Sequence, residues 1–137
     1  MSSARTQIEQ DIHPTIVTDP DQPRVTVYCI DTCSTCKTAR KDLEAAGYAV
    51  FWHDVKGKDM GFDDWQSIEE AVGWEAMVNK QSQTWRKLSD ADKEGLNRET
   101  ALELLVANPT LMKRPVIDCG DRMTVGWTDE VKAQYDL

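Results

Sequence analysis

The stretch Arg24-Val-Thr-Val-Tyr-Cys-Ile-Asp-Thr-Cys-Ser-Thr-Cys36 decides the fold of this chain. Residues 24–30 carry β-branched and aromatic side chains in a short run, which is typical of a buried strand. The next segment has small and apolar residues at helical spacing, namely Cys36, Ala39, Leu43 and Ala46. Gly47 stands where such a helix would end. We therefore expect a strand that leads into a helix, with Cys33 in the first helical turn and Cys36 one turn further in, on the apolar side.

These two cysteines are spaced for thiol–disulfide chemistry. The first turn of a helix has unpaired N–H groups and the positive end of the helix dipole, and both favour a thiolate at Cys33. In this setting a cysteine pKa can fall from about 8.5 to between roughly 3.5 and 7.5. Cys36 is close enough to attack a mixed disulfide formed on Cys33, while its side chain points toward the core. The spacing predicts an exposed nucleophile and a buried resolving thiol.

Length and composition exclude several classes of protein. A chain of 137 residues is long enough for one domain with its own hydrophobic core, and its net charge of −8 argues against a nucleic-acid or polybasic membrane surface. No apolar stretch approaches the roughly 20 residues of a membrane span. Residues 1–23 are polar and lack an apolar signal core, so we interpret them as a flexible leader. The absence of a signal indicates the cytoplasm, where cysteines are more often redox-active or free than structural.

The rest of the chain predicts the order β-α-β, a helical block, and β-β-α. A second strand is expected at residues 48–53, and the single helix between the two strands predicts that they pair in parallel. Helical signals run over residues 62–108, with Leu102, Leu105 and Val106 turned inward in the last helix. Short strands follow at residues 116–119 and 123–125, and Thr128 caps a final helix. We expect a single α/β domain over residues 24–137, with the helical block at about 62–110.

A β-α-β/β-β-α frame with Cys-x-x-Cys after its first strand resembles the thioredoxin fold. Further motifs resemble the arsenate-reductase-like (ArsC) family, and fit best its branch with the Spx regulators and the YffB-like proteins. They are Val27-Tyr28, Gly73-Trp-Glu-Ala76, Thr84-Trp-Arg-Lys-Leu88, Lys113-Arg-Pro115 and Val125-Gly-Trp127. The likeness covers about residues 25–137. It implies that the helical block is an insertion between the second and third strands.

The resemblance also implies a partner for the thiols. Arg114 and Pro115 would lie beside Cys33, with the bond before the proline in the cis form, which costs only about 0.5–1 kcal/mol. The turned backbone would offer a partner chain or a tripeptide an edge to pair with. Arg114 would stabilise the thiolate and an anionic substrate together.

The chain departs from the arsenate reductases of this family at several positions. Those enzymes hold the oxyanion with three arginines, and only Arg114 has a counterpart here. Asn79, next to Lys80, stands at the helical-block position, and Gly126 stands at the C-terminal one. Each missing charge-assisted hydrogen bond is worth roughly 1.5–3 kcal/mol. Cys29 replaces the histidine four residues before the nucleophile, and Cys36 replaces a serine, which supplies a resolving thiol.

The leading hypothesis is a cytoplasmic thiol–disulfide oxidoreductase that acts on a disulfide or glutathionylated substrate. Its expected catalytic residues are Cys33 and Cys36, and its expected substrate-binding residues are Arg114, Pro115, Asn79, Lys80 and Arg86. No bound cofactor or metal is expected, and glutathione or thioredoxin would be the reductant. The alternative is a redox-sensing regulator like the Spx proteins, which bind RNA polymerase, and arsenate reduction is the least favoured activity. We expect a monomer without direct contact with nucleic acid or membrane.

The remaining cysteines, the basic cluster and Trp85 each have more than one interpretation. Cys29 and Cys119 are interpreted as small core residues, although a zinc site of all four cysteines is an alternative if Cys29 points toward the helix start. The spacing of the first three cysteines also occurs in radical-SAM iron–sulfur sites, which need a much larger barrel. The basic cluster of Lys80, Arg86 and Lys87 would recognise glutathione carboxylates or form a solvated face. Trp85 would line a bound peptide or belong to the core.

Overall fold

The central strand, β1 (Arg24–Cys29), sends alternate side chains to the two faces of the sheet. Val25, Val27 and Cys29 are buried on one face, and Thr26 and Tyr28 lie half-buried on the other. The computed structural model describes residues 22–57 and 60–137, so the expected leader lies outside the described residues except for Gln22 and Pro23.

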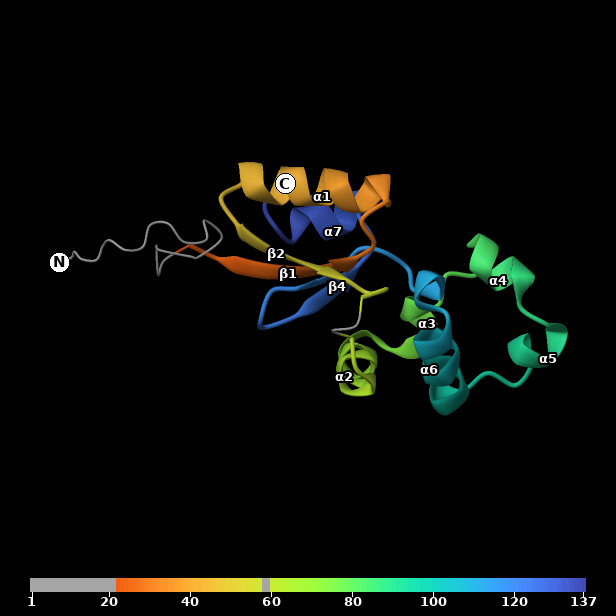
Figure 1. The fold of residues 1–137 in the computed structure, drawn as a ribbon. Helices are drawn as coiled ribbons and strands as arrows, with labels where there is room; N and C mark the ends of the chain where they lie inside the picture. Colours follow the sequence, from red (N-terminus) through yellow and green to blue (C-terminus); the bar gives the residue numbers. More distant parts are fainter. Residues whose placement is uncertain (1–21, 58–59) are drawn as a thin grey trace.

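The sheet has four strands in the order β2-β1-β3-β4 (Figure 1). β1 pairs in parallel with β2 (Ala49–Asp54) and antiparallel with β3 (Val116–Asp118), which pairs antiparallel with β4 (Met123–Val125). The parallel pair is joined through one helix, as its spacing predicts. The thioredoxin-like β-α-β/β-β-α core that the sequence predicts is confirmed.

Two helices, α1 (Ser34–Ala45) and α7 (Asp129–Ala133), lie together over one face of the sheet (Figure 1). The buried side of α1 consists of Cys36, Ala39 and Leu43, each 0% exposed. The hydroxyl of Thr128 accepts a hydrogen bond from the Val131 amide at 3.2 Å and caps α7 as expected. The predicted helical spacing therefore places Cys36 in the core beneath α1.

The helical block lies between β2 and β3, as the resemblance implies. It comprises α2 (Phe62–Val72), α3 (Trp74–Met77), α4 (Gln83–Lys87), α5 (Asp90–Lys93), α6 (Arg98–Ala107) and the 3-10 turn η1 (Pro109–Leu111). The expectation that Val106 turns inward is wrong, because it is 42% exposed. The inward face of α6 is centred on Ala101, Leu102 and Leu105, and Val106 lies at its edge. Among the helices of the described residues, none is long and apolar enough to cross a membrane.

The core consists of two clusters of buried residues. One lies beneath α1 and α7 and includes Cys29, Cys36 and Leu43. The other lies in the helical block and reaches β3; it includes Ile30, Val55, Trp65, Ile68, Leu102, Leu105, Met112 and Val116. Cys33 packs against both clusters. The first cysteine of the pair is therefore located where the sheet domain meets the inserted helices.

Candidate active site

Cys33 is the N-cap residue of α1. Its backbone is extended, with φ −83° and ψ 115°, and its side chain makes no capping hydrogen bond. Its amide donates to the Ile30 carbonyl at 3.1 Å, and its carbonyl accepts from the Lys37 amide at 3.1 Å. The side chain is half-buried, so part of it faces solvent at the positive end of the helix. This is a suitable position for a thiol that attacks an external disulfide.

Cys36 lies one turn further along α1 and is 0% exposed. All four cysteines, the other two being Cys29 and Cys119, are in the free thiol form. Only Cys33 of the pair reaches the surface, which supports the division of roles predicted from the sequence. Among the described residues, no group of three cysteine, histidine or acidic side chains is placed to hold a metal ion.

Three thiols shape the electrostatics of the site. The Cys29 thiol, acting as hydrogen-bond donor, is the main cause that lowers the pKa of Cys36 to about 7, against the opposing effect of burial. The Cys33 thiol, the Ile30 backbone and the charge of Arg114 lower the pKa of Cys36 further. The same hydrogen bond, and then burial, raise the pKa of Cys29. Within this buried pair, Cys36 is therefore the sulfur that ionises, and Cys29 keeps its proton.

This effect of Cys29 on the pKa of Cys36, within one buried cluster, is the feature that the sequence interpretation missed. Cys29 is indeed a core residue, with 0% exposure, but it is also a neighbour of the redox pair. The alternation of buried residues in β1 indicates it, because it places Val25, Val27 and Cys29 on the face of the sheet that α1 covers. Cys119, in contrast, is not a core residue. It is half-buried in the turn after β3, where its thiol lies 3.2 Å from an Asp121 carboxylate oxygen.

Arg114 is held at the junction by the end of the helical block. Its Nη1 donates to the carbonyl oxygens of Thr110 at 3.0 Å and Met112 at 3.2 Å, while its buried Nε has no partner among the described residues. The positive charge of Arg114 also contributes to the lowered pKa of the Cys36 thiol. The Arg114–Pro115 peptide bond is cis, as the resemblance implied. Pro115 is buried, and its carbonyl accepts from the Gly126 amide at 2.8 Å.

The three other predicted substrate-binding residues lie in α4 and in the segment that leads into it. Asn79 is beside the Arg114 loop, because its amide donates to the Leu111 carbonyl at 2.9 Å. Its side-chain oxygen accepts from the Gln81 amide at 3.0 Å and so shapes the local turn. Lys80 is exposed, with its Nζ 5.6 Å from the centre of the Trp85 ring, and Arg86 is exposed on α4. Within the described residues, the charge of Arg114 acts on Cys36, but no contact joins either thiol of the pair to Lys80 or Arg86.

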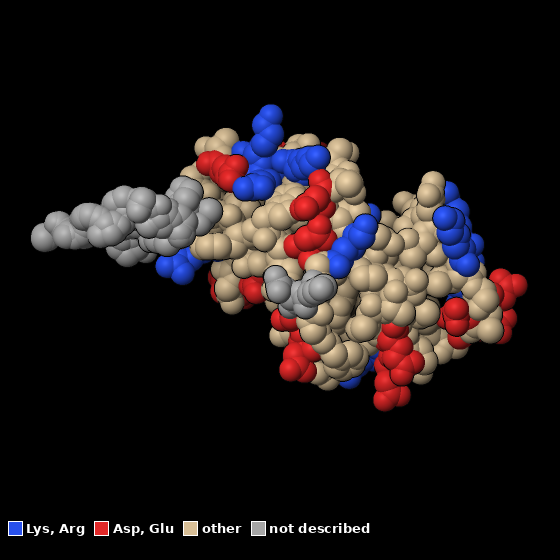
Figure 2. All heavy atoms as spheres, in the orientation of Figure 1, with Lys and Arg blue, Asp and Glu red and all other residues tan. Residues whose placement is uncertain are grey.

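The charged side chains of the helical block are visible on its outer surface. Figure 2 shows basic side chains gathered at the α4 end of the block, with acidic side chains beside them. The basic residues are Lys80, Arg86 and Lys87, and the neighbouring acids of α5 are Asp90 and Asp92. Lys93 also lies near Trp85, with its Nζ 5.5 Å from the ring centre. Trp85 is thus covered by two ammonium groups.

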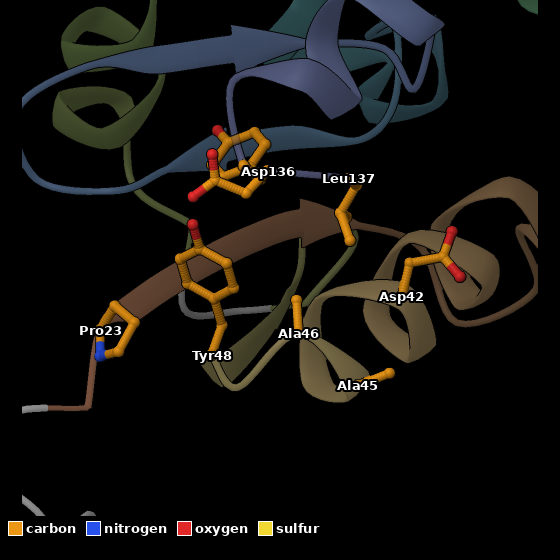
Figure 3. A pocket seen from close by; sticks show the side chains of 8 residues that line it. Pro23, Asp42, Ala45, Ala46, Tyr48, Asp136 and Leu137 are labelled. Carbon is orange, nitrogen blue, oxygen red and sulfur yellow. The ribbon is translucent and has the colours of Figure 1, made fainter.

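A pocket of about 500 Å³ lies at the opposite end of α1 (Figure 3). It is lined by Pro23, Asp42, Ala45, Ala46, Tyr48, Tyr135, Asp136 and Leu137. Because α1 has 12 residues, its ends are about 18 Å apart. The pocket and the thiol pair are therefore separate features, and the thiols are located at the junction between the sheet and the inserted helices.

A thioredoxin-like sheet with Cys-x-x-Cys at the start of α1 and a cis-proline before β3 defines the class of thioredoxin-like thiol-redox proteins. The ArsC family model matches residues 28–134, and the chain belongs to the ArsC family.

Individual relatives agree with this assignment. An uncharacterized protein of Haemophilus influenzae is 39% identical over 108 residues, which are 77% of this chain and 93% of the relative. The global transcriptional regulator Spx of Streptococcus pyogenes is 30% identical over 112 residues, 80% of this chain and 83% of that protein. The solved structure of the YFFB protein has 32% identity and a TM-score of 0.74, and the match covers 81% of this chain and 97% of that one. These similarities support a thiol-redox protein of the ArsC family.

Proposed function

We propose that this protein is a thiol–disulfide oxidoreductase in which Cys33 attacks and Cys36 resolves. The proposal rests on the difference in exposure between the two sulfurs and on the lowered pKa of the buried one. Cys33 is half-buried at the N-terminus of α1, and Cys36 is fully buried one turn away with its pKa lowered to about 7. A substrate reaches the first sulfur only, and the second is ionised enough to act within the protein.

The reaction transfers two electrons from the thiol pair to the substrate. The Cys33 thiolate attacks one sulfur of a disulfide or glutathionylated substrate, and the other sulfur leaves as a thiolate that takes up a proton. The Cys36 thiolate then attacks the Cys33 sulfur of the mixed disulfide, which forms the Cys33–Cys36 disulfide and releases the second substrate thiolate. Two glutathione molecules or one thioredoxin dithiol would reduce the pair again. No bound cofactor is required.

Substrate recognition is assigned to the residues around the junction. Arg114 is half-buried, and only its Nη1 has hydrogen-bond partners in the described part of the chain, so the exposed part of its guanidinium would bind an anionic group beside the thiols. Pro115 and the turned backbone before β3 would pair with an extended peptide. Lys80 and Arg86, with Asn79 at the entry to α4, would bind the carboxylates of glutathione at the edge of the site.

Arsenate reduction is the least supported activity. Arg114 is the one arginine at the three family positions, and its Nη1 is already engaged by two backbone carbonyls. The side-chain oxygen of Asn79 is engaged in its own turn. Gly126 has a φ of +88°, which an arginine adopts only with strain. We expect no arsenate-dependent consumption of glutathione or thioredoxin.

The test is reduction of a glutathionylated peptide by four forms of the full chain: wild type, C33S, C36S and C119S. We expect C33S to be inactive and C36S to accumulate a mixed disulfide with the peptide, visible by mass spectrometry. C119S serves as the matched control, because Cys119 lies in the turn after β3, and it should retain wild-type rates. Full activity of C33S would overturn the proposal.

A second candidate function is a redox-sensing regulator that binds RNA polymerase. It is favoured by the similarity to the Spx regulator of Streptococcus pyogenes, in addition to the Cys33–Cys36 pair. In this case the disulfide would switch binding and would not turn over. Co-purification with RNA polymerase from oxidised and reduced cells distinguishes the two functions. An association that oxidant changes supports the regulator, and the absence of any association in both states argues against it.

A further inference from the structure

The proposed reaction makes no use of the pocket at the C-terminal end of α1 (Figure 3). Its volume of about 500 Å³ lies within the range of small-molecule sites, roughly 300–1,000 Å³. Its walls come from three parts of the chain: Pro23 before β1, the end of α1 together with Tyr48, and residues 135–137 after α7. The fold therefore brings distant segments together around one hollow.

Two carboxylates reach this pocket from different elements. Asp42 belongs to α1 and Asp136 follows α7, and Figure 3 shows their side chains on opposite sides of Leu137. Trp127 donates its indole N–H to Asp42 Oδ2 at 3.1 Å, which orients this carboxylate without neutralising it. Within the described residues, neither aspartate belongs to an ion pair, and no lysine, arginine or histidine lines the pocket. The walls thus supply two negative charges and no counterion.

The backbone of α1 adds to this negative potential. The C-terminal end of a helix carries the equivalent of about half a negative charge, which a basic side chain in the last turn often offsets. The last turn of α1 has no basic residue, and Ala45 and Ala46 at this end of the helix line the pocket. A positive group bound in the pocket would therefore interact favourably with the helix end as well as with the two carboxylates.

The rest of the lining is aromatic and apolar. The ring of Tyr48 lies edge-on to the buried ring of Tyr135, with their centres 5.9 Å apart. Burial and the charge of Asp136 raise the pKa of Tyr48, so its phenol stays neutral. Leu137 is 44% exposed and offers apolar surface that a ligand would cover. Such a wall suits methylene groups, and the face of an aromatic ring also attracts a cation.

These features favour an organic cation over a metal ion or a cation of the protein itself. Among the described residues, no group of three cysteine, histidine or acidic side chains is placed to hold a metal ion. The charge of Arg122 acts on Tyr48, but this guanidinium is engaged elsewhere. Its Nη1 lies 3.2 Å from an Asp121 carboxylate oxygen, and its Nη2 donates to the Gln134 carbonyl at 2.6 Å.

We propose that this pocket binds a small aliphatic amine with two or more ammonium groups, whose charged ends contact Asp42 and Asp136 and whose methylene chain covers Leu137. The two carboxylates bind the ammonium groups, and the apolar surface between them accepts the chain. The inference is independent of the proposed redox reaction, because Cys33 and Cys36 lie at the other end of α1.

The first test compares three probes of equal chain length on the ¹⁵N-labelled full chain by NMR: diaminohexane, hexylamine and hexanediol. We expect diaminohexane to shift the amide signals of Ala45, Ala46 and Tyr48 and the indole N–H signal of Trp127, which reports on Asp42. It should bind about fivefold more tightly than hexylamine, which has one charge, and hexanediol should bind most weakly. Equal binding of hexanediol, or shifts that avoid these signals, would overturn the proposal.

The second test separates the site from the general negative charge of the chain. D42N and D136N remove one charge each with little change of shape, and asparagine tolerates the φ of +63° at position 136. D63N is the matched control, because it removes the same charge from the exposed start of α2. We expect each pocket variant to bind diaminohexane about fivefold more weakly and D63N to change binding by less than about twofold. Equal weakening in all three variants would show long-range attraction only and would overturn the site.

Discussion

The amide of Lys113 donates a hydrogen bond of 2.7 Å to the carbonyl oxygen of Met77. This bond joins the loop before β3 to the end of α3, and the antiparallel bridge between Val78 and Met112 continues the pairing. The residue after Lys113 is Arg114, so the helical block fixes the position of this guanidinium group. The inserted helices thus contribute to the proposed redox site, although both of its thiols lie at the start of α1.

Arg114 should therefore have separable structural and electrostatic effects. We expect R114A to lose about 2–4 kcal/mol of stability, because two carbonyl acceptors lose a charged donor. It should also raise the pKa of Cys36, because the neighbouring positive charge favours the thiolate. R114K keeps the charge but lacks the fixed guanidinium group whose Nη1 donates to both carbonyls. Urea denaturation should show that R114K loses stability, while ¹³C NMR should show a Cys36 titration close to that of the wild type.

The packing of α2 against α6 should depend on one ion pair. Glu69 is 8% exposed and accepts from the Nε of Arg98, whereas the neighbouring Glu70 is exposed and lies 3.8 Å from Arg98. R98A leaves a nearly buried carboxylate without its partner, so we expect a loss of about 1–3 kcal/mol. E70A removes an exposed contact and should change stability by less than about 0.5 kcal/mol. Similar losses in the two variants, measured by urea denaturation, would refute this assignment.

The sequence predicts the fold well because its periodicities follow burial directly. The alternation in β1 and the helical spacing in α1 locate Cys33 and Cys36 without knowledge of the tertiary structure. The effect of Cys29 on the pKa of Cys36 relates a residue of a strand to a residue of a helix, and residue spacing within one element does not report it. The position of Arg114 is equally hard to predict, since its anchoring by carbonyls in η1 and directly after it depends on how the inserted helices pack.

Gly126 should be required for the backbone that supports Pro115. Its φ is +88°, and its amide donates to the Pro115 carbonyl at 2.8 Å. A side chain at this φ is strained, so we expect G126A to lose about 1–2 kcal/mol. G61A is the matched control, because Gly61 has a φ of −95° and space for a Cβ atom, and it should stay within about 0.5 kcal/mol of the wild type. Equal stabilities of G126A and the wild type would show that the strain is absent.

The buried thiol pair should give stability a characteristic pH dependence. The pKa of Cys36 is about 7 in the folded chain, against an ordinary value of 9.0, so its contribution is present above pH 9 and is lost as the pH falls through 7. The pKa of Cys29 is raised, so the unfolded chain releases this proton first and stability declines above pH 9. The contribution of the pair therefore peaks near pH 9.

Denaturation from pH 6 to pH 10 under reducing conditions checks this dependence. We expect stability from the pair to rise between pH 7 and pH 9 by at most about 2–3 kcal/mol, which is the equivalent of a shift of two pKa units. C36S removes the group that titrates in this window, so its difference from the wild type should grow as the pH rises to 9. C119S retains both members of the pair and should follow the wild type. A constant difference between C36S and wild type across this range would show that Cys36 does not ionise at a lowered pKa in the folded chain.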